Sequence, residues 1–75
     1  MTMACSDIQA LILQGLPKAS VDVTTEDHHH FQAQVVCPSF SGLSMLQQHR
    51  LVYDTLGSKM GNEIHALALT TRTPE

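Results

Sequence analysis

The sequence predicts a single α+β domain in which a three-stranded sheet carries helices on one face. Apolar residues recur at helical spacing in residues 8–16 and 45–60, and they alternate with polar residues in residues 21–35 and 64–70. The order of elements is therefore αββααβ, or αββαβ if the second helical stretch is continuous. One sheet with helices over one face is the economical packing of that order. A chain of 75 residues, 1–75, has room for one domain.

The first helix is predicted to begin at Ser6. The segment from Ser6 to Gln9 has the spacing of a capping box, in which both side chains bind backbone N–H groups that the helix leaves unpaired; Thr2 is an alternative cap. Gly15 and Pro17 end the helix. The side chains expected to face the core are Ile8, Leu11, Ile12 and Leu16.

An antiparallel hairpin is predicted to follow. Val21 and Val23 alternate with polar neighbours, residues 25–29 form a turn, and the alternation resumes from Phe31 to Val35. One face of the hairpin is therefore expected to be apolar and the other to face water. Pro38 has no N–H group to donate to a strand ladder, so the hairpin ends before it.

Residues 45–60 are predicted to be helical. The core-facing stripe of this helix is Met45, His49, Val52, Leu56 and Met60. Gly57 and Gly61 weaken the helix, so we expect a break or two short helices.

The last strand is predicted at residues 64–70. Successive side chains of a strand point to opposite faces of the sheet. His65 is therefore expected to share a face with Leu67 and Leu69. The residues expected on the other face are Ile64, Ala66 and Ala68.

Composition excludes several functions. The apolar runs are far shorter than the roughly 20 residues that span a bilayer, and no basic residues precede an apolar stretch near the N-terminus. We therefore expect a cytoplasmic protein without membrane association, whose Cys5 and Cys37 are free thiols. The net charge is −3, with only four Lys and Arg residues, which argues against strong nucleic-acid binding by this chain alone.

The residues offer little support for an enzyme active site. Cys37 directly precedes Pro38 at a strand end, and no acidic residue is evident to orient a histidine beside it. Glu26 and Asp27 lie in a predicted turn, where solvated charge is the ordinary explanation. No phosphate-binding or dinucleotide fingerprint is present. We expect a protein without enzymatic activity.

The histidines are the most suggestive residues. Five are present, three of them in the run 28–30. Imidazole is the commonest metal ligand in proteins, yet the run is equally compatible with a polar hairpin tip, and His65 with a hydrogen-bonded structural residue. If the last strand lies beside the hairpin, two imidazoles can reach one metal. A closed zinc or iron–sulfur site needs four ligands, so the others would come from a second molecule.

Five short segments together resemble the BolA-like family: HF at 30–31, FSG at 40–42, QHRLVY at 48–53, IHAL at 64–67 and TRTPE at 71–75. The resemblance covers nearly the whole chain. It implies an αββααβ fold like a class II KH domain, with a helix-turn-helix-like pair in the middle. It also implies a heterodimer with a monothiol glutaredoxin that shares a 2Fe-2S cluster, with glutathione, for iron–sulfur assembly, trafficking or iron and redox regulation. No cofactor is expected in the isolated protein.

The resemblance also suggests which residues bind the cluster. His65 matches the family's ligand in the final strand. A second ligand comes from the hairpin loop in many members, and His28 and His29 are the candidates by position. His30 matches the histidine before the family's phenylalanine, which favours a structural role for it.

The family implies an alternative function, DNA-binding transcriptional regulation through the helix-turn-helix-like segment. Arg50 and Lys59 would then contact the DNA. KH domains bind nucleic acid with a GxxG loop, which this chain lacks where the helices meet. Because this loop is missing and the net charge is negative, DNA binding is the second candidate function, and DNA is expected to bind weakly.

Overall fold

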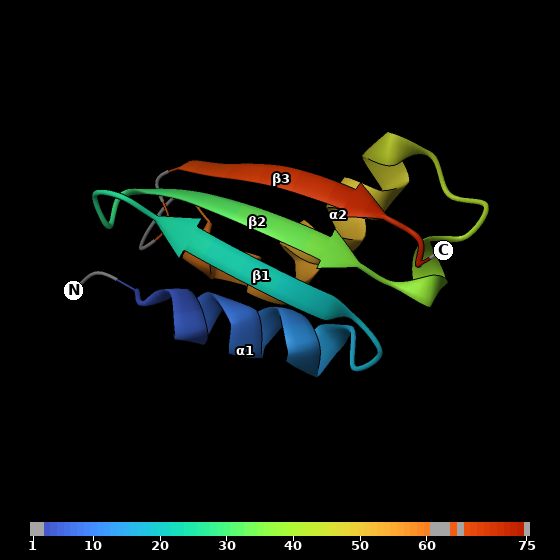
Figure 1. Cartoon of the computed structure of the whole chain (residues 1–75), viewed down its shortest axis with the longest axis horizontal. Coiled ribbons are helices and arrows are strands. Elements are labelled where there is room, and N and C mark those ends of the chain that lie inside the picture. The colour runs from blue at the N-terminus through green and yellow to red at the C-terminus, as the bar shows by residue number, and fades with distance from the viewer. Residues whose placement is uncertain (1–2, 61–63, 65, 75) are drawn as a thin grey trace.

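Three strands form one mixed sheet, with β2 in the centre (Figure 1). The computed structural model describes residues 3–60, 64 and 66–74. β1 (Ser20–Thr25) pairs antiparallel with β2 (His30–Val36), and β2 pairs parallel with β3 (Ala66–Arg72). α1 (Cys5–Gly15) contacts β1 and α2 (Met45–Leu56), and α2 also contacts β3. The predicted α+β class and three-stranded sheet are confirmed.

The core lies between the helices and one face of the sheet. Alternate residues of β2, namely Phe31, Ala33 and Val35, point into it, whereas Gln32 and Gln34 are exposed on the opposite face. The hairpin therefore has one apolar and one wet face, as predicted. The buried apolar residues are Ile8, Ile12, Leu16, Val23, Phe31, Ala33, Val35, Cys37, Phe40, Val52, Leu56 and Ile64.

The start of α1 differs from the prediction. The helix begins at Cys5 rather than Ser6, and the Asp7 carboxylate accepts a hydrogen bond from the Ala4 N–H at 3.1 Å. Gln9 does not cap the helix; its Nε2 donates to the Val21 carbonyl of β1 at 3.1 Å. Ser6 was the wrong cap because an acidic residue one position later reaches back to the helix start. Thr2 lies outside the described residues.

α2 begins with a capping box that the sequence interpretation overlooked. The Ser44 hydroxyl accepts from the Gln47 N–H at 3.2 Å, and the Gln47 side chain accepts from the Ser44 N–H at 3.0 Å. Val52 and Leu56 of the predicted stripe are buried, but Met45 is 57% exposed. The prediction of Met45 as a core residue was wrong: its sulfur lies 3.3 Å from the Thr71 hydroxyl of β3, but more than half of the residue is exposed.

The connection between α2 and β3 contains the predicted break. Gly57 has a positive φ of 55°, and a short 3-10 turn, η2 (Gly57–Lys59), replaces the second helix of the αββααβ order. Another short 3-10 turn, η1 (Pro38–Phe40), precedes α2. Ile64 is buried and forms an isolated bridge with Met60 outside β3, so the expected strand alternation begins only at Ala66. Placing Ile64 on the face of Ala66 was therefore wrong.

Two expectations from composition can be compared with the described part of the chain. No helix within it is both long enough and apolar enough to cross a membrane. Cys37 is buried in the core and Cys5 is half-buried, and neither forms a disulfide, in agreement with the prediction of free thiols.

Candidate metal-ligand site at the hairpin

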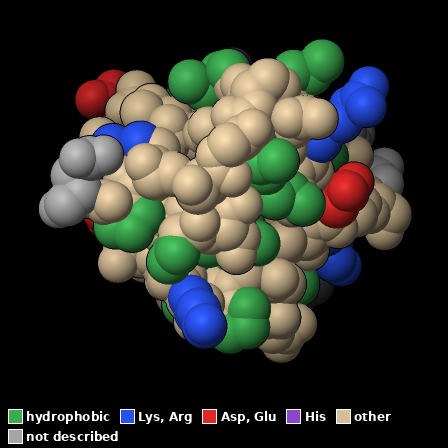
Figure 2. All heavy atoms as spheres, turned by 90° about the vertical axis from the view of Figure 1, so that its right-hand side faces the viewer, with side chains coloured by type: hydrophobic (Ala, Val, Ile, Leu, Met, Phe, Trp, Pro, Cys, Tyr) green, Lys and Arg blue, Asp and Glu red, His purple; other side chains and the backbone are tan. Residues whose placement is uncertain are grey.

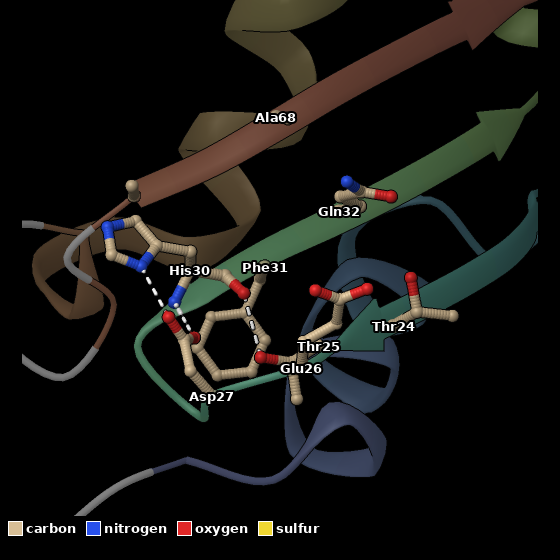
Figure 3. Close-up of a pocket in the computed structure, with 9 residues that line it drawn as sticks. Thr24, Thr25, Glu26, Asp27, His30, Phe31, Gln32 and Ala68 are labelled. Atoms are coloured by element: carbon tan, nitrogen blue, oxygen red, sulfur yellow. Dashed lines mark hydrogen bonds and ion pairs between the residues drawn. The ribbon is translucent and has the colours of Figure 1, made fainter.

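The open face of the sheet is hollowed at the hairpin tip (Figure 3). The hollow has a volume of about 340 Å³ and lies where the end of β1, the start of β2 and the start of β3 meet. Most of the residues that line it are polar, and two alanines of β3 also line it. The lining residues are Thr24, Thr25, Glu26, Asp27, His30, Phe31, Gln32, Ala66 and Ala68.

The register of the sheet brings the start of β3 beside His30. His30, the first residue of β2, pairs with Ala66, the first residue of β3. Ala66 follows His65 in the sequence, and His65 itself lies outside the described residues. The final strand therefore lies beside the hairpin, which is the arrangement that a site shared by the two histidine segments requires.

Asp27 organises the turn between β1 and β2. One carboxylate oxygen, Oδ1, accepts the backbone N–H groups of His29 at 2.9 Å and His30 at 2.8 Å. The other, Oδ2, lies 2.8 Å from Nδ1 of the His30 ring. The backbone hydrogen bond from His30 and the contact with its ring, followed by the bond from His29, hold the pKa of Asp27 well below its usual range.

Thr25 supplies the second fixed point of the turn. Its hydroxyl accepts from the His28 N–H at 3.0 Å and donates to the His30 carbonyl at 2.7 Å. His28 adopts a left-handed backbone conformation with φ of 63°. Side chains of Thr25 and Asp27 thus replace the backbone hydrogen bonds that a tighter turn would form.

The three hairpin histidines occupy different positions. His28 and His29 are exposed in the turn, whereas His30 belongs to β2 and points to the open face. The His30 side chain is 71% exposed and that of Asp27 49%, so their contact adds little stability and serves mainly to orient the ring. Figure 3 shows the Asp27 carboxylate facing the His30 ring at the edge of the hollow.

The chemistry of this pair suits a metal ligand. A histidine that gives one ring nitrogen to a carboxylate presents the other nitrogen in a fixed direction, as metal-binding histidines do. In residues 3–60, 64 and 66–74, no group of three or more His, Cys, Asp or Glu side chains is placed to hold a metal ion. The described side chains can therefore provide some, but not all, of the ligands that a metal site needs. Sequence interpretation treated Asp27 as solvated charge and overlooked its role.

The predicted DNA-contacting residues lie elsewhere. Arg50 is exposed on α2, Lys59 is exposed in η2, and neither lines the hollow. On the face shown in Figure 2, Lys and Arg side chains lie apart from one another rather than in one basic patch. The remaining histidine, His49, is half-buried on α2, with its ring edge-on to Tyr53 at a centroid distance of 6.5 Å.

Comparison with known proteins identifies the family. Residues 13–75 match the family model described as BolA-like protein. BolA-like protein 1 of Homo sapiens is 51% identical over 45 residues, which cover 60% of this chain but only 33% of the human protein. SufE-like protein 1 of Arabidopsis thaliana is 38% identical over 45 residues, 60% of this chain and 12% of that protein. The chain thus spans a third or less of these two relatives.

A solved structure extends the similarity to the whole fold. A bolA protein homologue from Coxiella burnetii superposes with a TM-score of 0.85 at 44% identity, covering 97% of this chain and 94% of that one. The family match covers both the hairpin histidines and the final strand. The chain is therefore a member of the BolA-like family.

Proposed function

We propose that this protein partners a monothiol glutaredoxin and shares a 2Fe-2S cluster with it, for iron–sulfur assembly, trafficking or iron and redox regulation. This chain supplies two ligands, His65 and one histidine of the hairpin. The observation that carries the proposal is the β2–β3 register, in which His30 pairs with the residue that follows His65. The start of β2 and the start of β3, which are far apart in the sequence, therefore lie side by side at one end of the sheet.

The number of donors supports a shared cluster. A 2Fe-2S cluster takes four ligands, and histidine can replace cysteine at one of its irons. Neither cysteine of this chain lines the hollow, since Cys37 is buried in the core and Cys5 packs against it. The glutaredoxin and its glutathione would provide the two sulfur ligands. The similarity to a SufE-like protein supports an iron–sulfur role.

Mixing the two proteins with glutathione, iron and sulfide tests the proposal. A heterocomplex with visible absorption characteristic of a 2Fe-2S cluster is expected, and its spectrum should change and its lifetime shorten in His65→Ala. His49→Gln removes an imidazole from α2 and serves as the matched control. The same titration without iron detects docking alone. A complex whose visible spectrum is unaltered in His65→Ala would exclude this ligand assignment and leave an adaptor that docks without binding iron.

A further inference from the structure

We infer that Asp27 is a positioning residue for His30, and that it holds the His30 ring with its proton on Nδ1 so that Nε2 faces outward as the hairpin's ligand to iron. This inference rests on the proposed function and deepens it, because it names one ligand among the three hairpin histidines and the residue that orients it. The hairpin ligand is therefore assigned to His30 rather than to His28 or His29, the two candidates suggested by their position in the sequence.

The hydrogen bond determines which ring nitrogen is available. A carboxylate has no proton to donate, so the contact of 2.8 Å between Asp27 Oδ2 and His30 Nδ1 requires that Nδ1 carries the hydrogen. In the neutral ring, Nε2 then keeps its lone pair, which is the form that binds a metal. Free histidine carries its hydrogen mainly on Nε2, so the hydrogen bond to Asp27 selects the less common tautomer.

His30 is also anchored through its backbone at the start of β2. Its backbone N–H binds Asp27, its carbonyl accepts from Thr25, and its strand pairs with Ala66. His28 and His29 belong to the turn, where the side chains of Thr25 and Asp27 accept their backbone N–H groups. Ligands on strands are placed more accurately than ligands on loops, and less side-chain entropy is lost when they bind.

The surroundings of His30 leave space for a partner's cluster. The pairing residue on β3 is Ala66, and Ala68 follows on the same face, so these two residues of the strand present small methyl side chains to the hollow. The hollow of about 340 Å³ that results is open toward the solvent. A larger group carried by a second protein can therefore approach Nε2 from the open face of the sheet.

The tautomer can be measured without any metal. Long-range proton–nitrogen correlation spectra of the protein at neutral to mildly basic pH should show His30 with hydrogen on Nδ1. Asp27→Asn keeps an oxygen for the two backbone N–H groups but turns an amide N–H₂ toward the ring, so the proton should move to Nε2. Asp54→Asn removes an equal charge from an exposed residue of α2 that does not line the hollow, and it should leave the tautomer unchanged. Hydrogen on Nε2 in the wild type would overturn the inference.

The same variants are then compared in the complex with the glutaredoxin. His30→Ala should abolish the wild-type visible spectrum or replace it, and Asp27→Asn should shorten the cluster lifetime by about 10- to 100-fold, the usual effect of removing a carboxylate behind a metal-binding histidine. Asp54→Asn, His28→Ala and His29→Ala should behave as the wild type. Amide spectra of each variant alone establish that it is folded.

Besides hydrogen on Nε2 in the wild type, three results with the complex would contradict the inference, and one other would contradict the proposed function instead. The inference fails if His30→Ala leaves the cluster unchanged, if His28→Ala or His29→Ala removes it, or if the Asp27→Asn tautomer switches without any effect on cluster lifetime. The proposed function fails if the wild-type protein gives no cluster-containing complex at all. In that case the measured tautomer of His30 would still be as described, but it would serve no ligand role.

Discussion

Replacing Gly15 by alanine is expected to destabilise the domain, although alanine is the better helix former. Gly15 is the last residue of α1, and a methyl group added there would collide with Cγ2 of Thr55 on α2. The Thr55 hydroxyl donates to the Val52 carbonyl at 2.6 Å, which holds the rotamer that places Cγ2 against Gly15. The two helices touch at this point, so either the helices must move apart or Thr55 must adopt another rotamer.

The magnitude follows from three competing terms. Overpacking at a close contact costs about 1–3 kcal/mol. Rotating Thr55 out of the way instead sacrifices its hydrogen bond, worth about 0.5–1.5 kcal/mol. Alanine recovers up to about 1 kcal/mol of helix propensity, and less at a helix end. The net loss should be about 1 kcal/mol, which lowers the Tm of a domain of this size by about 4–8 °C.

Thr55→Ser provides the decisive control, because it deletes Cγ2 and keeps the hydroxyl. In that background, Gly15→Ala should cost much less, because the closest atom is gone and only the Cβ contact of 3.1 Å remains. Urea and thermal unfolding of the four proteins measure the coupling between the two sites. Equal destabilisation in both backgrounds, or stabilisation of the wild type by Gly15→Ala, would refute the argument from close packing.

The remaining predictions concern the hairpin, a buried hydrogen bond and DNA. The carboxyl of Asp27 should titrate below the ordinary value of about 3.9 in a carbon-detected NMR titration. Because its folded pKa is lowered, the stabilisation that Asp27 gives the turn is present above that ordinary value and lost as the pH falls through the folded pKa; a normal midpoint would contradict this geometry. Thr71 is 4% exposed, and its hydroxyl donates to Gln48 Oε1 at 2.7 Å. Thr71→Val should cost about 1 kcal/mol in urea unfolding because it leaves that oxygen without its donor, whereas an unchanged midpoint would show that water replaces the hydroxyl. DNA binding by the free protein should be weak and vanish as salt is raised; a tight, sequence-preferring complex that is lost in Arg50→Ala would instead favour the regulatory alternative.

Local patterns predicted most of the fold. The alternation around Val23 and Phe31 placed the two strands of the hairpin correctly, because the period of a strand is visible in the sequence. The helix starts were less accurate, since several polar residues near each start can act as a cap. At the start of α1, the side chain of Asp7 rather than that of the predicted Ser6 accepts a backbone N–H group. The Ser44 capping box was present in the sequence and was overlooked in favour of the stripe that follows it.

The site was only partly predictable. The resemblance to the family pointed to His65 and to the hairpin; the structure places His30 beside Ala66, whereas His65 lies outside the described residues. The role of Asp27 was not predicted, because an Asp in a turn ordinarily points into water and its spacing from His30 has no unique meaning. Its contacts became apparent only when the turn geometry brought both carboxylate oxygens against the start of β2.

By itself, the sequence determined the α+β class, the apolar face of the hairpin, the break after α2 and the family, because these depend on periodicity, glycine and short motifs along the chain. The tertiary structure alone decided which hairpin histidine pairs with the final strand and which carboxylate orients it. Parallel pairing of β2 with β3 joins segments that are separated by α2, and no local pattern records its register. The physical reason is that side-chain direction at the hairpin depends on this long-range pairing and on a turn held by Thr25 and Asp27.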